Sequence, residues 1–240
     1  MSLPDVVSRE DWLAARRRLL AQEKELTRRH DQLNADRRRL PMVKVEKNYT
    51  FDGPNGPVTL KQLFGDRRQL IVQHVMLGPD WDQPCPGCSA ALDELSAGVL
   101  NHLGSRETAF VLVSRAPYDK IAATAKERGW DVPWYSSYGS DFNYDYQVTL
   151  DESVGQLQYN YRPEPDLLGG ERSTEMPGYS AFLREGAEVF HTYSAFSRGT
   201  EYTGNAYTFL DMTALGRQED WEEPKGRVAP VRGGDPTFTS

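Results

Sequence analysis

The chain has 240 residues, of which 38% are hydrophobic, and this is enough apolar material for one substantial core with appended segments. Its formal net charge of −7 argues against nucleic acid and anionic membranes as partners, because both would repel it. The N-terminal residues lack a basic start followed by an apolar run, and no stretch approaches the roughly 20 apolar residues of a spanning helix, so we expect a cytoplasmic protein.

A long helix is predicted over residues 9–39. Ser8 and Asp11 resemble a capping box, and from Arg9 onwards neither Gly nor Pro occurs until Pro41. Apolar residues recur every seven positions, whereas the companion position of a coiled coil is mostly polar. This pattern favours a narrow stripe that lies on the body of the protein or on a partner subunit, as in a homodimer. The stripe consists of Trp12, Leu19, Leu26, Leu33 and Leu40.

A hairpin over 49–51 and 58–60, joined by the turn residues GPNG, comes next. The apolar run LIVQHVML at 70–77 predicts a buried strand. Directly afterwards, an amphipathic helix is expected from about Pro86. Its apolar positions are Ala91, Leu92, Leu95, Val99 and Leu103.

The only two cysteines of the chain, Cys85 and Cys88, lie where this helix begins. Unpaired N–H groups and the helix dipole favour a thiolate there, and the CxxC spacing lowers the pKa further. Cys85 is therefore the expected nucleophile, and Cys88 the resolving thiol. Half of a zinc site is the alternative, but the sequence has no second CxxC or HxxxH to supply the remaining ligands. In a reducing compartment the pair indicates catalytic redox chemistry, with no further cofactor.

Strands and helices alternate after the cysteines, which predicts a largely parallel sheet. A strand at 109–114 leads to a helix around 118–128, and a later pair at 179–183 and 188–193 predicts an antiparallel hairpin. A last helix is expected over 203–215. The stretch 151–177, rich in Gly, Pro and charge, is predicted to be a long surface insertion, and residues 222–240 a disordered tail. The domain organisation expected is thus a helical extension at 1–42 and one α/β domain at 43–221.

This order resembles a thioredoxin-like fold, a three-layer α/β sandwich, and the early hairpin NYTFDGPNGPVTLKQLF resembles the peroxiredoxin-like branch. The segments QLIVQHVMLGPDWDQPCPGCS, VLVSRAPYDKI and GWDVPWYSSYGSDFNYDY resemble more specifically the bacterial domain-of-unknown-function family 899. That resemblance implies a predicted dithiol-disulfide oxidoreductase.

Two features depart from the relatives. Thioredoxins carry a cis-proline before the first strand of the C-terminal hairpin, facing the cysteines, and the nearest candidate here is Pro177. If Pro177 does not take that place, a small-molecule substrate becomes more attractive than an extended peptide. The PxxxTxxC pattern of peroxiredoxins is also missing.

The segment 134–146, WYSSYGSDFNYDY, concentrates six aromatic residues among Ser, Asp, Asn and Gly. Two interpretations stay open: aromatic packing that pins a loop to the sheet, or the wall of a substrate pocket. Arg115, after the second strand, either stabilises the Cys85 thiolate or forms a salt bridge. The predicted substrate-binding residues are Trp81, Arg115, Trp134, Tyr138, Ser140, Asp141 and Tyr144.

Three functions are compatible with the cysteine pair and the aromatic loop. In the first, Cys85 attacks a disulfide or peroxide, Cys88 resolves the intermediate, and a cellular thiol reductant completes the cycle. In the second, an enzyme acts on a small aromatic metabolite held by the loop 134–146. In the third, the thioredoxin-like module binds copper or zinc, with Cys85, Cys88 and His191 as the copper ligands, although a structural role for His191 is favoured over that site.

Overall fold

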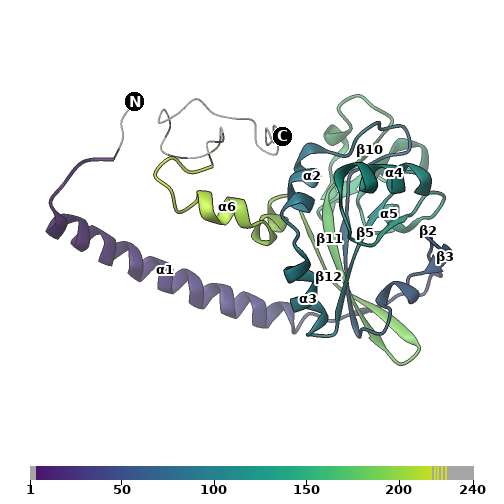
Figure 1. The fold of residues 1–240 in the computed structure, drawn as a ribbon, viewed down its shortest axis with the longest axis horizontal. Coiled ribbons are helices and arrows are strands. Elements are labelled where there is room, and N and C mark those ends of the chain that lie inside the picture. The colour runs from purple at the N-terminus through teal and green to yellow at the C-terminus, as the bar shows by residue number, and fades with distance from the viewer. Residues whose placement is uncertain (1–3, 218, 220, 222, 224, 226–240) are drawn as a thin grey trace.

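The computed structural model describes residues 4–217, 219, 221, 223 and 225 (Figure 1). Its centre is an eight-stranded sheet in the order β1-β12-β11-β4-β5-β6-β2-β3. The strands of this sheet are β1 (Val43–Lys44), β2 (Thr50–Gly53), β3 (Gly56–Thr59), β4 (Gln69–His74), β5 (Thr108–Ser114), β6 (Trp134–Ser136), β11 (Gly178–Glu185) and β12 (Glu188–Phe196). The helices are α1 (Arg9–Arg37), α2 (Pro86–Asp93), α3 (Ala97–Gly104), α4 (Tyr118–Arg128), α5 (Phe142–Asp145) and α6 (Asn205–Leu210).

Four central strands carry the order β5-β4-β11-β12. Strands β4 and β5 are parallel, β11 runs antiparallel to β4, and β12 runs antiparallel to β11. This is the strand arrangement of a thioredoxin-like fold, which confirms the predicted fold class. The predicted hairpin at 179–183 and 188–193 is confirmed as well, since β11 and β12 pair along their whole length.

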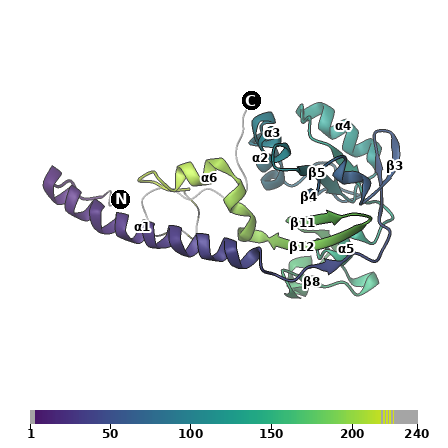
Figure 2. The same ribbon diagram turned by 90° about the horizontal axis from the view of Figure 1, so that it is seen from below.

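The two faces of the sheet are covered by different elements. Helices α2, α3 and α4 contribute to one buried cluster and lie together on one side of the strands (Figure 2). Helix α5 and the short 3₁₀ helix at Gln62–Phe64 contribute Phe142 and Phe64 to a second cluster on the other face. Together with the sheet these layers form a three-layer sandwich.

The helix expected to follow the cysteines is in fact two helices. Helix α2 ends at Asp93, and α3 begins after Ser96, whose hydroxyl accepts a hydrogen bond from Val99 N–H. The apolar periodicity continues across the break, so the pattern alone did not reveal it. A serine N-cap is the signal that marks the second start. The last predicted helix, 203–215, is also shorter than expected, because it is helical only over α6 and follows the 3₁₀ helix Ser197–Thr203.

Helix α1 has the predicted cap, in which Ser8 Oγ accepts from Asp11 N–H. It contacts the body of the protein through residues outside the predicted stripe, with Arg37 over the Tyr193 ring and His30 beside Tyr202. None of its residues is buried, and the five residues of the predicted stripe are between 47% and 68% exposed. Both ribbon views show α1 projecting away from the sheet (Figures 1 and 2). The interpretation that the stripe packs on the body of its own chain is therefore wrong.

The segment 151–177, expected to be a surface insertion, carries ordered elements and part of a core. It contains β8 (Gln158–Tyr159), β9 (Arg162–Pro163), the 3₁₀ helices Glu152–Val154 and Pro165–Leu168, and β10 (Ser173–Glu175). β10 pairs with β7 (Thr149–Asp151), and Tyr159 and Leu168 join a third buried cluster. The predicted tail at 222–240 falls outside the described residues except for positions 223 and 225. Within the described part of the chain, no helix combines the length and apolar character needed to cross a bilayer.

Candidate functional site

The dithiol lies where the chain passes from β4 into α2. Cys85 is the N-cap residue of α2, and Pro86 occupies the first turn. Met76, two residues beyond β4, fixes both cysteines: its carbonyl accepts from Cys85 N–H at 3.0 Å, and its N–H donates to Cys88 Sγ at 3.5 Å. Cys85 is half-buried, whereas Cys88 is buried on the inner face of the helix. Both cysteines are free thiols in this structure.

The two thiols have opposite electrostatic environments. The thiol of Cys88 and the backbone N–H groups of Cys88 and Gly87 lower the pKa of Cys85 to about 6, against the opposing effect of burial. Interaction with Cys85 and burial both raise the pKa of Cys88 well above its usual range. The positive end of the helix dipole also favours the thiolate of Cys85, the N-cap residue, and so lowers its pKa. At neutral pH the pair thus holds one thiolate and one thiol, with the thiolate at the more exposed position.

Two tyrosines, which we did not identify from sequence, lie near Cys88: Tyr159 is buried and Tyr179 is partly buried. Burial raises the pKa values of Tyr159 and Tyr179, and a charge on Cys88 would raise both further. The Tyr159 hydroxyl donates to the Pro177 carbonyl at 2.8 Å and accepts from Ser197 N–H at 2.9 Å. Tyr159 comes from the segment 151–177, so this segment helps to build the wall around the dithiol.

Trp81 belongs to the loop between β4 and the cysteines. It packs against the same buried cluster as Cys85. The Lys120 ammonium fixes the loop by donating to the carbonyls of Pro79 and Trp81, at 2.7 and 3.0 Å. A Cβ atom on Gly78 would lie 3.0 Å from the Trp81 ring and 3.5 Å from Glu175 Cγ, so glycine permits the close approach of all three residues. Of the predicted substrate contacts, Trp81 and Trp134 belong to the cluster against which Cys85 packs.

Arg115 forms an ion pair with a buried carboxylate. Its Nη1 lies 3.3 Å from Glu175 Oε1, and its guanidinium lies 4.7 Å from the centre of the Tyr144 ring. The Tyr144 hydroxyl donates to Asp151, and Thr149 Oγ1 donates to Glu175 at 2.7 Å. Burial raises the pKa of Glu175 although Arg115 opposes this. The structure thus brings Arg115 and Tyr144 together, and the sequence offered no signal for their partner Glu175.

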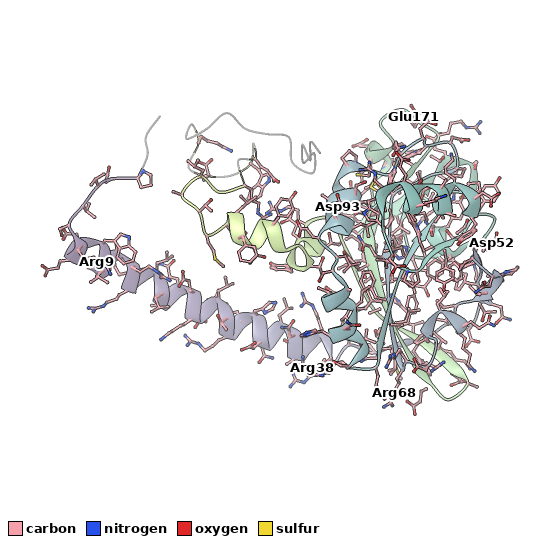
Figure 3. All side chains as sticks on the ribbon, in the orientation of Figure 1. Arg9, Arg38, Asp52, Arg68, Asp93 and Glu171 are labelled. Carbon is pink, nitrogen blue, oxygen red and sulfur yellow. The ribbon has the colours of Figure 1, made fainter. Side chains whose placement is uncertain are left out.

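Three other predicted residues line a separate hollow. Tyr138, Ser140 and Asp141 surround a cavity of about 410 Å³ together with residues 47–52 and Gly139. Neither cysteine contributes to its lining. Asp52, on the rim of this hollow, lies well apart from Asp93 at the end of α2 (Figure 3). The loop 134–146 therefore does not bring all its polar residues to one pocket with the dithiol.

Most aromatic side chains of that loop pack inside the protein. Trp134 is buried and donates from Nε1 to Ser114 Oγ at 3.0 Å. Phe142 packs edge-on against Tyr49 and Phe51, and Tyr146 packs against Phe142. These contacts support the interpretation that aromatic packing pins the loop to the sheet.

His191 lies apart from the cysteines, in a polar chain across three strands. Its Nε2 is 2.8 Å from Ser194 Oγ, Ser194 Oγ is 2.9 Å from Ser180 Oγ, and Ser180 Oγ is 2.9 Å from His74 Nε2. Burial lowers the pKa of His74 to about 3. Within the described residues, no group of three His, Cys, Asp or Glu side chains is placed to hold a metal ion. The copper set of Cys85, Cys88 and His191 is thus not assembled.

Comparison with known families gives one match over nearly the whole chain. A family model described as bacterial protein of unknown function (DUF899) matches residues 1–232. The chain belongs to this family, as the sequence resemblance predicted. No curated protein matches the DUF899 chain.

Several solved structures are similar to this DUF899 protein. Xanthomonas campestris peroxiredoxin Q has a TM-score of 0.45 at 12% identity, covering 73% of this chain and 98% of its own. Xylella fastidiosa PrxQ, as a mutant, has a TM-score of 0.44 at 11% identity over 70% and 95%. Peroxidoxin BcpB from Mycobacterium tuberculosis has a TM-score of 0.40 at 14% identity over 68% and 91%.

Proposed function

We propose that this DUF899 protein is a thiol-dependent reductase that works through the Cys85/Cys88 dithiol in the bacterial cytoplasm. The supporting observation is the division of roles within the pair. Cys85 has a pKa of about 6 at a half-buried helix N-terminus, and Cys88 is a buried thiol whose pKa is raised. A nucleophile must be ionised and reachable, and a resolving thiol must be close and protonated until its turn comes.

The reaction follows from these two states. The Cys85 thiolate attacks one sulfur of a disulfide RSSR, forming a Cys85–SR bond while the S–S bond breaks and RS⁻ leaves. Cys88 then loses its proton and attacks Cys85 Sγ, which closes the Cys85–Cys88 disulfide and releases the second RS⁻. The two electrons of the dithiol thus reduce RSSR to two thiols. Two equivalents of a cellular thiol restore the dithiol, and no further cofactor takes part.

Paired serine variants test this assignment. A redox titration of the native protein should give a reversible two-electron couple. Cys85→Ser should abolish disulfide reduction, whereas Cys88→Ser should accumulate the mixed disulfide on Cys85, detectable as added mass. Because the chain has only two cysteines, each variant leaves a single thiol to follow. Full turnover by both variants would exclude the dithiol mechanism.

A second candidate function, an enzyme acting on a small aromatic metabolite, has the 410 Å³ hollow in its favour. Tyr138 is exposed at this hollow and presents a ring on which a planar ligand stacks. A library of small aromatic compounds, measured by thermal shift against the wild type and Tyr138→Ser, tests this. Stabilisation that the variant loses would support it, and no stabilising compound would count against it.

A further inference from the structure

We propose that the substrate of the dithiol is a low-molecular-weight disulfide rather than an extended peptide; this rests on the proposed function. A peptide is commonly recognised as an added strand, through backbone hydrogen bonds to free N–H and C=O groups of the protein. Such groups would have to lie beside Cys85. Three of the groups that lie there are already hydrogen-bonded within the chain.

The strand register identifies the backbone beside the dithiol. Gly178, the first residue of β11, is paired with His74, the last residue of β4. Extending this antiparallel register by two residues places Pro177 and Met176 beside Val75 and Met76. Met76 is the residue that holds both cysteines through its backbone. The segment 176–177 is therefore the strand-like backbone on which a peptide next to Cys85 would dock.

Internal partners take the N–H groups of Met176 and Val75 and the carbonyl of Pro177. Met176 N–H donates to the Val148 carbonyl at 2.9 Å, directly beyond the pairing of β7 with β10. Pro177 has no N–H, and its carbonyl accepts from Tyr159. On the β4 side, Val75 N–H donates to the Val113 carbonyl. An incoming peptide would find these groups already bonded.

Side-chain packing closes the same place. Val148, Tyr159 and Phe196 form a buried cluster against which Met176 packs. A Cβ atom on Gly178 would lie 3.0 Å from Phe196, 3.2 Å from the Ala195 carbonyl oxygen and 3.2 Å from Val148. A peptide strand would have to displace β7 and open this cluster. A compact disulfide needs only to reach Cys85 Sγ, so the geometry admits it.

Two matched substrates test the inference. One is bis(2-hydroxyethyl) disulfide. The other is a ten-residue extended peptide whose single cysteine carries the same 2-hydroxyethyl group in disulfide linkage, with shorter peptides of three and six residues as intermediates. When Cys85 attacks the peptide sulfur, both substrates release 2-mercaptoethanol as the leaving thiolate, so kcat/KM then compares recognition. Mass spectrometry of Cys88→Ser identifies which group the mixed disulfide carries and therefore which sulfur was attacked.

We expect kcat/KM to stay flat or to fall as the peptide lengthens. A rise of tenfold or more with length, carried by a falling KM, would overturn the inference, because it would show backbone docking. Failure to reduce either substrate would refute the proposed function itself, and this outcome is distinct from a preference for the peptide.

From the charge and the exposed apolar residues of helix α1 we further propose that this helix packs against a second copy of this chain. Residues 1–42 carry ten Lys and Arg against seven Asp and Glu, a net charge of +3, so the remaining 198 residues carry −10 of the total of −7. The apolar stripe of α1 is about half exposed along its length. Tyr202, Phe209 and Met212, around α6, are exposed apolar side chains on the acidic part.

Opposite charge and matching apolar surface favour an exchange in which the arm of each copy lies on the body of the other. Pairing of two arms with each other would bring like net charges together. Sedimentation velocity at micromolar concentration should show a dimer that weakens as salt rises. Leu26→Glu, on the stripe, should give a monomer, and Ala21→Glu, which adds the same charge on the opposite side of α1, should remain a dimer. A monomeric wild type, or a dimer that tolerates Leu26→Glu, would overturn the proposal.

Discussion

Replacing Cys88 by alanine should raise the pKa of Cys85 and thereby slow its reactions at neutral pH. The thiol of Cys88 is the largest influence that lowers this pKa to about 6, ahead of the backbone N–H groups of Cys88 and Gly87. At pH 7 a pKa of about 6 corresponds to a thiolate fraction of about 90%, whereas a thiol at its ordinary pKa is only a few per cent ionised. Because the backbone donors remain in the variant, the pKa should rise only part of the way, and each unit of the rise corresponds to about 1.4 kcal/mol.

The measurement is the rate of alkylation by iodoacetamide between pH 4 and pH 10, followed by intact mass. Cys88→Ala leaves Cys85 as the sole thiol, so the profile has a single midpoint to assign. Cys88→Ser keeps a hydroxyl donor and serves as the matched control, with a smaller expected rise. If the wild-type midpoint lies at the ordinary thiol pKa, or if Cys88→Ala leaves the midpoint unchanged, the account of the dithiol is wrong.

Three further predictions concern stability. His74 is buried and neutral, with a pKa of about 3. The free energy of unfolding should therefore fall as the pH drops below about 6.5, by up to ~5 kcal/mol near pH 3. Urea unfolding of His74→Gln should show a shallower pH dependence than that of the wild type. Arg115→Met leaves Glu175 buried without its cation and should lower the free energy of unfolding by about 3–5 kcal/mol, measured by chemical denaturation. Adding Glu175→Gln to the same chain should restore part of this loss, and no recovery would argue against the ion pair. Gly178→Ala should lower the free energy of unfolding by about 1–3 kcal/mol, because the new Cβ atom meets backbone and core atoms. Gly98→Ala, which has room for a Cβ atom in α3, is the control. Equal effects of the two substitutions in thermal melts would contradict this explanation.

The local sequence determined the elements on which the site is built. The apolar run before the cysteines, the CxxC pair at a helix start and the hairpin at 179–183 and 188–193 all depend on residues near one another along the chain. Strand alternation, helical periodicity and N-cap chemistry act over a few residues, so the sequence could specify them. The order of these elements was enough to predict a thioredoxin-like sheet.

Only the tertiary structure decided which side chains meet. Arg115 pairs with Glu175, sixty residues away. Tyr159 and Pro177, which lie near the two ends of a segment expected to be a surface insertion, form a hydrogen bond with each other. The loop 134–146 sends Trp134 into the core and Tyr138 to a separate hollow. Ion pairs and packing between distant segments depend on how the chain closes in three dimensions, and a local pattern does not encode that closure. The position of the two sulfur atoms at a helix start could therefore be predicted from their neighbours in sequence, but the wall around them could not.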